Sequence, residues 1–144
     1  ERVRPVLLQL GQRVTHMGAV GAGQVTKACN QMIVACNALV IAEVVALAEQ
    51  SGVDASLIAE ALAGGFADSK PLQILAPRMA AQSFTPVQWK VQTLSKDLNN
   101  ALHLAQNFNL KIPVAQKALT QLQAHQENGF SENDLATIIQ YIEQ

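Results

Sequence analysis

The sequence predicts an all-α protein, a bundle of helices around one long central helix. Two observations lead to this fold class. Hydrophobic residues make up 49% of the 144 residues but aromatic residues only 4%, and β-rich domains need more β-branched and aromatic side chains. After Gly18, apolar residues recur with the helical period and strand patterns are nearly absent.

The first 17 residues differ in pattern from the rest of the chain. The stretch RVRPVLLQLGQ predicts a helix ending near Gly11, and RVTHMG predicts a short strand over residues 13–18. That strand has no partner elsewhere in the sequence. We therefore expect residues 1–17 to be the tail of an upstream α/β domain, the chain to be a C-terminal fragment, and residues 18–144 to form a helical domain.

The central helix is expected over residues 22–50. Its most apolar run, Met32 to Ala48, has 17 residues, just under the roughly 20 that span a membrane. Asn37 and Glu43 interrupt the run. A fully buried central helix is therefore a better interpretation than a membrane span.

Short breaks separate the next two helices. Asp54 is a suitable N-cap for a second helix, which should end at the glycine pair 64–65. A third helix should begin near Ser69, with a proline in its first turn, and fade by Gln82. Pro77 should kink this helix or separate a short second piece from it.

Three more helices are expected in the last third of the chain. They should span residues 87–108, residues 113–127 and the segment after Ser131. Pro113 opens the second of them, because proline is favoured in a first turn. Ser131, followed three residues later by Asp134, predicts a near capping box for the last one.

Charge and cysteine usage narrow the possible functions. The net charge is −1 and no basic run is present, which argues against nucleic acid or an anionic membrane as a partner. Cys29 and Cys36 lie about 10 Å apart on one helix, beyond disulfide reach. They are interpreted as small buried residues in a reducing compartment, which predicts a cytoplasmic location. Without a CxxC motif or a His/Cys cluster, no metal site is expected.

The stretch GAVGAGQVTKACNQ, residues 18–31, leads into the central helix. Its glycines read G-x-x-G-x-G, which is neither the Rossmann nor the P-loop pattern. By themselves they indicate close backbone approach and a flexible entry to the helix, whose free amides could meet an anion.

Lys27 follows these glycines on a polar patch of the helix. It shares a helix face with Gly23, Asn30 and Gln31. Buried polar groups need partners, so this patch should border a cleft. The alternative is a lysine solvated at the exposed end of the helix. The helix dipole disfavours a lysine near an N-terminus, which supports a functional reason for it.

Two further stretches could carry chemistry. The first is QTLSKDLNNAL, residues 92–102. Four polar residues cluster at helical spacing in and just after this stretch, beside Asp97: Lys96, Asn99, Asn100 and His103. The alternative is an ordinary solvated helix face. GGFADSKP, residues 64–71, combines two glycines with Phe66 and could line a pocket or only connect two helices.

At these three stretches the sequence resembles the β-hydroxyacid dehydrogenase family. This family includes 3-hydroxyisobutyrate dehydrogenase, 6-phosphogluconate dehydrogenase and tartronate semialdehyde reductase. The likeness covers Gly18 to about Gln140, the family's all-helical C-terminal domain, and residues 1–17 resemble the end of the family's Rossmann domain. GQVTKACNQ, ALAGGFADSKPL and KDLNNAL are most similar to the tartronate semialdehyde reductase subgroup.

The resemblance implies roles for individual residues. It implies that Lys27 is the catalytic lysine and that Lys96 reaches the nicotinamide side of the cofactor. Gln31 stands where many members have asparagine. The resemblance also implies that five residues bind or edge the substrate: Gly23, Asn30, Gln31, Phe66 and Ser69.

The implied activity is NAD(P)-dependent interconversion of a small hydroxyacid and its semialdehyde. Hydride transfer to an aldehyde develops negative charge on oxygen, which a positioned ammonium stabilises and can protonate. NAD or NADP would be bound mainly by the upstream domain, so the chain alone should be inert. The alternative function is a non-enzymatic helical dimerisation module, because the central helix is more apolar than one small domain can cover. With either function we expect a homodimer or higher homo-oligomer.

Overall fold

The computed structural model describes residues 3–143; Glu1, Arg2 and Gln144, including the start of the predicted N-terminal helix and tail, lie outside the described residues. It is an all-α bundle, and within residues 3–143 the one β pairing is an isolated bridge between Lys90 and Asp134. The elements in order are α1 Arg4–Leu7, α2 Ala22–Gln50, η1 Ala55–Leu57, α3 Ile58–Leu62, α4 Lys70–Ala80, α5 Val91–Gln106, α6 Pro113–His125, η2 Gln126–Phe130, η3 Leu135–Ile138 and α7 Ile139–Ile142. The predicted fold class is confirmed.

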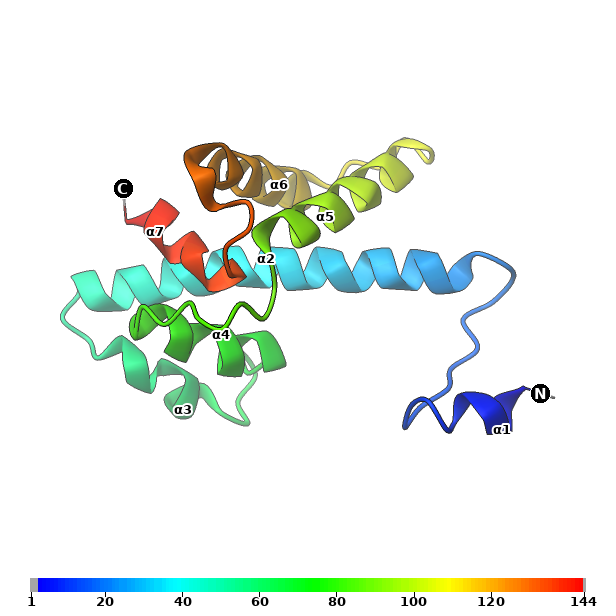
Figure 1. The fold of residues 1–144 in the computed structure, drawn as a ribbon, viewed down its shortest axis with the longest axis horizontal. Helices are drawn as coiled ribbons and strands as arrows, with labels where there is room; N and C mark the ends of the chain where they lie inside the picture. Colours follow the sequence, from blue (N-terminus) through cyan, green and yellow to red (C-terminus); the bar gives the residue numbers. More distant parts are fainter. Residues whose placement is uncertain (1–2, 144) are drawn as a thin grey trace.

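Helix α2 runs through the length of the molecule, and α4, α5, α6 and α7 pack along it (Figure 1). Its bounds, Ala22–Gln50, agree with the sequence prediction. Its core side carries small side chains such as Ala35, Ala38 and Ala42, all fully buried, which let neighbouring helices approach closely. By length and composition alone α2 could cross a membrane, but half of its most apolar window is buried inside the molecule, as in a core helix.

The two helices after α2 begin at the predicted caps. The Asp54 carboxylate accepts a hydrogen bond from the Ser56 N–H at 3.0 Å, and a 3-10 turn then leads into α3. The Ser69 hydroxyl accepts from the Leu72 N–H at 3.1 Å and caps α4. Helix α4 continues through Pro77 to Ala80, so this proline does not divide the helix.

Helix α5 begins at Val91, four residues later than predicted. The Asp134 carboxylate accepts hydrogen bonds from the Gln88 and Trp89 N–H groups, at 2.6 and 3.3 Å. The Trp89 carbonyl accepts from the Leu135 N–H at 2.7 Å. These bonds hold the segment before Val91 out of the helix, so the predicted start at residue 87 is wrong.

The last helical segment is capped by Asp134 rather than by Ser131. Asp134 Oδ1 accepts from the Ala136 N–H at 3.0 Å, and a 3-10 turn then leads into α7. Ser131 lies outside this turn, and its hydroxyl donates to Gln92 Oε1 at 3.2 Å. The predicted capping box is therefore wrong.

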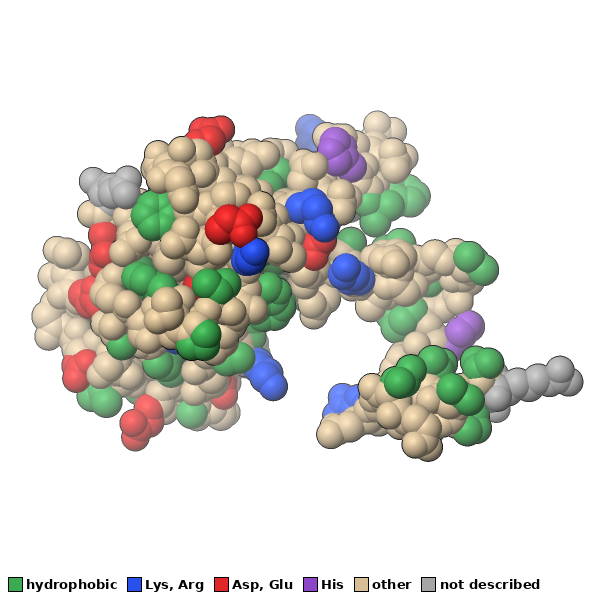
Figure 2. Space-filling model, in the orientation of Figure 1, with side chains coloured by type: hydrophobic (Ala, Val, Ile, Leu, Met, Phe, Trp, Pro, Cys, Tyr) green, Lys and Arg blue, Asp and Glu red, His purple; other side chains and the backbone are tan. Residues whose placement is uncertain are grey.

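The N-terminal segment has little regular structure. Helix α1 is a single turn ending at Leu7, and no strand forms over residues 13–18, so the predicted strand is wrong. A strand needs a partner, and this part of the chain offers none. Figure 2 shows hydrophobic side chains gathered on this segment; the exposed ones are Val3, Val6, Leu7, Leu8 and Leu10.

The two cysteines differ from the sequence prediction in their exposure. Cys29 is exposed, because it precedes the point where α2 enters the bundle. Cys36 is half-buried against the core, and this burial raises the pKa of its thiol. The prediction of two buried thiols is wrong for Cys29.

Candidate active site

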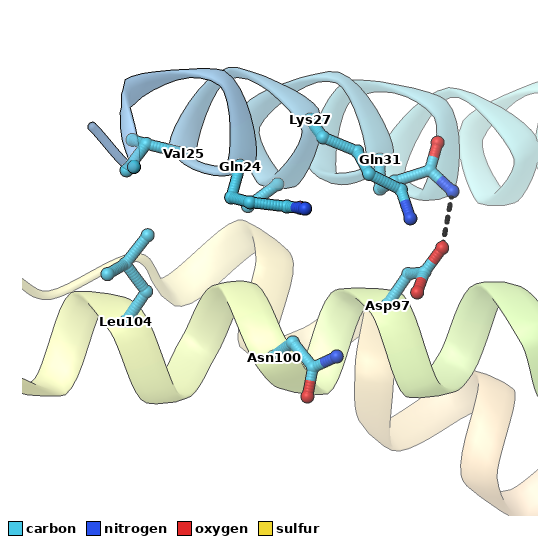
Figure 3. A pocket seen from close by; sticks show the side chains of 9 residues that line it. Gln24, Val25, Lys27, Gln31, Asp97, Asn100 and Leu104 are labelled. Atoms are coloured by element: carbon cyan, nitrogen blue, oxygen red, sulfur yellow. Dashed lines mark hydrogen bonds between the residues drawn. The ribbon is translucent and has the colours of Figure 1, made fainter. Parts of the chain in front are cut away.

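A pocket of about 390 Å³ lies between the N-terminal part of α2 and the middle of α5. Lys27 and Gln31 extend into it from α2, toward Asp97 and Asn100 on α5 (Figure 3). The complete lining is Gly21, Gln24, Val25, Lys27, Ala28, Gln31, Asp97, Asn100 and Leu104. The structure thus places two of the predicted site residues, Lys27 and Gln31, in one cavity.

The glycines before α2 shape the entrance to this pocket. Gly21 is the N-cap of α2, has a φ of 95° and lines the pocket. Gly18 also has a positive φ, of 130°. Residues with a side chain are strained in this region, so glycine lets the chain turn from the preceding loop into the helix.

Gln31 is the first buried residue of α2, with 8% of its surface exposed. Its Nε2 donates to Asp97 Oδ2 at 2.7 Å, which connects α2 with α5 across the pocket. Asn30 Nδ2 donates to Gln31 Oε1 at 3.1 Å. A carboxylate can only accept hydrogen bonds, so the nitrogen of the Gln31 amide must face Asp97 and its oxygen must face Asn30.

Lys27 is exposed on α2 one turn before Gln31, which places both side chains on the same helix face. Among the described residues, the ion pairs within 4.0 Å are Arg78–Asp134 and Lys90–Glu132. The Lys27 ammonium therefore remains available to a ligand in the pocket.

Lys96 lies in a different groove. This groove, of about 460 Å³, is formed by α5 and α6 and lined by Gln92, Thr93, Ser95, Lys96, Asn99, Gln123 and Gln126. Neighbouring residues on a helix point about 100° apart, so Lys96 and Asp97 serve different surfaces. The structure does not bring Lys96 into the Lys27 pocket.

The other predicted substrate residues lie outside this pocket. Asn30 is exposed beside it, and Gly23 is exposed on α2, where a Cβ would meet no atom within 4 Å. Phe66 is fully exposed in the connection between α3 and α4, and Ser69 caps α4. Both helices lie along the C-terminal half of α2 (Figure 1), whereas Lys27 stands near the N-terminal end.

Three polar residues of this pocket, Gln24, Asp97 and Asn100, were not among the predicted site residues. Asp97, Asn100 and Leu104 are spaced three and four residues apart, so they share the face of α5 that lines the pocket. This spacing was the available signal. In the described part of the chain, no three His, Cys, Asp or Glu side chains are grouped so as to hold a metal ion.

Several known proteins are similar to this chain in sequence. A family model described as the NAD-binding region of NADP-dependent 3-hydroxyisobutyrate dehydrogenase matches residues 21–142. The chain is 35% identical over 143 residues to 2-hydroxy-3-oxopropionate reductase of Escherichia coli (strain K12), covering 99% of this chain and 49% of that protein. It is 27% identical over 144 residues to NAD-dependent L-serine dehydrogenase of Pseudomonas aeruginosa, covering 96% and 48%. The chain spans about half the length of these relatives.

Two solved structures are similar to this chain in fold. 3-Hydroxyisobutyrate dehydrogenase from Salmonella typhimurium superposes with a TM-score of 0.88 at 21% identity, over 96% of this chain and 49% of that one. This likeness shows the fold. 3-Hydroxyisobutyrate dehydrogenase of Mycobacterium tuberculosis, solved with L-serine, gives a TM-score of 0.85 at 25% identity, over 99% and 51%.

Proposed function

Because the chain belongs to the NAD-binding family of 3-hydroxyisobutyrate dehydrogenases, we propose that it is the helical C-terminal domain of an NAD(P)-dependent oxidoreductase. This enzyme interconverts a small hydroxyacid and its semialdehyde, and Lys27 is its catalytic lysine. The observation that carries the proposal is the shared pocket of Lys27 and Gln31, facing Asp97 on α5.

The pocket has the chemistry of a site for a small polar substrate. It offers one ammonium, one carboxylate and the side-chain amides of Gln24, Gln31 and Asn100. Its volume of about 390 Å³ lies at the small end of the range for ligand pockets. Given the relative that reduces 2-hydroxy-3-oxopropionate, this semialdehyde is the first substrate to test.

Lys27 performs the proton transfer in this mechanism. The reduced cofactor, NADH or NADPH, would supply the hydride that reduces the carbonyl carbon when bound. The Lys27 ammonium stabilises the negative charge that develops on the carbonyl oxygen and donates a proton to it. The product is a hydroxyl group, and the neutral amine takes up another proton from solvent. In the oxidation direction the neutral amine accepts the hydroxyl proton.

Most of the cofactor contacts are proposed to come from the upstream Rossmann domain, with Lys96 reaching the nicotinamide side. Two observations support this division. The chain spans about half of its relatives, and the N-terminal segment exposes apolar side chains that a further domain would cover. The isolated chain should bind NAD(H) weakly or not at all. Micromolar binding in a calorimetric titration would contradict this.

A second function, self-association, is favoured by an apolar surface. We call it the self-association face: Ile33, Val40, Val44 and Leu47 on α2 and Val114 on α6, each at least 36% exposed. The α2 members recur at helical spacing and so form one stripe. We propose that two copies pair through this face about a two-fold axis. Catalysis and pairing are compatible, because the Lys27 pocket is lined by other residues.

The catalytic proposal is tested by assay of the full-length enzyme. Oxidation of NADH and of NADPH should be followed with 2-hydroxy-3-oxopropionate and with methylmalonate semialdehyde, the oxidation product of 3-hydroxyisobutyrate. Turnover of at least one semialdehyde is expected. No turnover with either cofactor would contradict the proposed activity.

A further inference from the structure

We propose that Asp97 and Asn30 are positioning residues that hold the Gln31 amide in one orientation at the edge of the Lys27 pocket. This inference rests on the proposed function and adds residues that act on the substrate through Gln31. Asp97 accepts from Gln31 Nε2 at 2.7 Å, and Asn30 donates to Gln31 Oε1 at 3.1 Å.

The two contacts fix the amide from both ends. The oxygen and nitrogen of a glutamine amide differ little in size, so a free amide can turn over and exchange donor for acceptor. Asp97 accepts only, so the turned-over amide would lose its bond to Asp97, and it would keep a bond to Asn30 only if the exposed Asn30 amide turned over as well. In the observed orientation Gln31 keeps one further N–H for a substrate oxygen.

The two hydrogen bonds of the Gln31 amide offset the cost of burying this side chain. Gln31 is 8% exposed and is followed on α2 by the apolar core residues Val34 and Ala35. A buried amide without partners carries a desolvation cost. Its partner Asp97 lies 66 residues away in the chain on α5, so the bond also joins the two helices that form the pocket.

A different role for Asp97 must be separated from this one. Asp97 lines the same pocket as Lys27, so its negative charge could act on the ammonium or on the substrate directly. Asp97→Asn removes the charge but keeps a carbonyl oxygen that can accept from Gln31. Asp97→Ala removes both.

The experiment measures kcat and KM for 2-hydroxy-3-oxopropionate in the intact enzyme at saturating cofactor. Asp97→Ala and Gln31→Ala should each lower kcat/KM about tenfold to a hundredfold, because the reacting group is misplaced. The double variant should be no worse than the worse single variant. Asp97→Asn should lose less than Asp97→Ala, because the asparagine carbonyl oxygen can still accept from Gln31 Nε2. Asn30→Ala should also lose less than Asp97→Ala, because the stronger charge-assisted bond between Gln31 and Asp97 remains.

Additive losses in the double variant would overturn the proposal, and so would an Asp97→Asn variant as damaged as Asp97→Ala. A second measurement does not depend on turnover. The side-chain amide protons of Gln31, observed by NMR, should shift and exchange faster with solvent in Asp97→Ala and not in the matched variant Lys111→Ala in an exposed loop. Unchanged Gln31 signals would refute the positioning role even in an inactive enzyme, whereas normal turnover by Lys27→Met would refute only the proposed catalytic role of Lys27.

Discussion

Arg78 Nη2 lies 3.4 Å from Asp134 Oδ1, and their side chains are only 14% and 1% exposed. The same Arg78 nitrogen donates to the Pro86 carbonyl at 3.1 Å. Asp134 also accepts from the backbone N–H groups of Gln88, Trp89 and Ala136. One carboxylate therefore joins α4, the segment before α5 and the start of η3.

Asp134→Ala should destabilise the protein strongly. It leaves a largely buried guanidinium without its carboxylate and three backbone N–H groups without an acceptor. We expect a loss of about 4 kcal/mol in the free energy of unfolding, measured by urea denaturation. The matched variant Glu132→Ala, which breaks the exposed pair with Lys90, should change stability little. Equal effects of the two changes would show that Asp134 does not act as a buried link.

The stability of the protein should depend on His125 at mildly acidic pH. His125 is fully buried, and its Nε2 lies 2.9 Å from Thr137 Oγ1. The Thr137 hydroxyl donates to the Asp134 carbonyl, so Nε2–H must be the donor to Thr137. The other ring nitrogen, Nδ1, has no partner. A second proton there would be unsatisfied, and burial lowers the pKa of His125 from 6.5 to about 4.

The sign of the effect follows from proton binding. Between pH 6.5 and 4 the unfolded chain binds a proton at residue 125 and the folded chain does not, so stability falls as the pH falls through this window. The loss should approach about 3 kcal/mol near pH 4. Urea denaturation from pH 7.5 to 4 should show a smaller loss in His125→Gln, which keeps a donor but does not titrate there. Parallel curves for both proteins would contradict the assignment.

Lys27→Met in the full-length enzyme should lower kcat about 10²- to 10⁴-fold, because the proposed acid–base group is lost. Lys27→Arg should fare nearly as badly, since a guanidinium holds its proton too tightly. Stability should change by less than about 0.5 kcal/mol, because Lys27 is exposed. Lys70→Met, at the exposed start of α4, serves as the control. Turnover by Lys27→Met within a few-fold of wild type would show that Lys27 has no catalytic role.

Lys96→Ala should mainly weaken cofactor binding. The predicted result is a KM for NAD(H) or NADP(H) raised about tenfold, the effect of losing a hydrogen bond from a charged group, with kcat less affected. Steady-state kinetics with varied cofactor measure it, and Lys111→Ala in an exposed loop is the comparison. Lys96 lies in a separate groove from Lys27, so its effect should be distinct from that of Lys27. Cofactor kinetics like those of the wild type would show that Lys96 is an ordinary solvated lysine.

The chain should form dimers of about twice 15.4 kDa, detected by light scattering. Val40→Asp places a charge in the centre of the self-association face and should give monomers, since burying an unpaired charge is costly. Val53→Asp changes an equally exposed valine outside that face and should leave the dimer intact. A wild-type protein that stays monomeric at high concentration would exclude the pairing.

Most of the fold could be predicted because local signals place it. Glycine at residue 21, Asp54, Ser69 and Pro113 mark helix starts that the structure reproduces closely. The errors arise where distant residues intervene. The start of α5 depends on the Asp134 carboxylate, 46 residues from Gln88, and no local pattern reports such a bond.

Less of the candidate site than of the fold could be predicted from the sequence. Helical spacing brings Lys27 and Gln31 to one face, and the structure agrees. Asp97 as the partner of Gln31 required knowledge of how α5 crosses α2, which depends on packing over the whole bundle. Lys96 and Asp97 are adjacent in sequence but point about 100° apart on α5, and they line separate pockets.

Gln31 also marks a boundary in local stability along α2. Residues 22–30 include no buried side chain, while core residues follow at short intervals afterwards. The first turns, which carry Lys27, therefore depend largely on backbone hydrogen bonds close to solvent, and such segments open at a lower free energy than the whole domain. A substrate that contacts Lys27 and Gln31 together must suppress this fraying. Part of its binding energy is then used to order the helix end, and bound substrate should slow amide hydrogen exchange there more than anywhere else in α2.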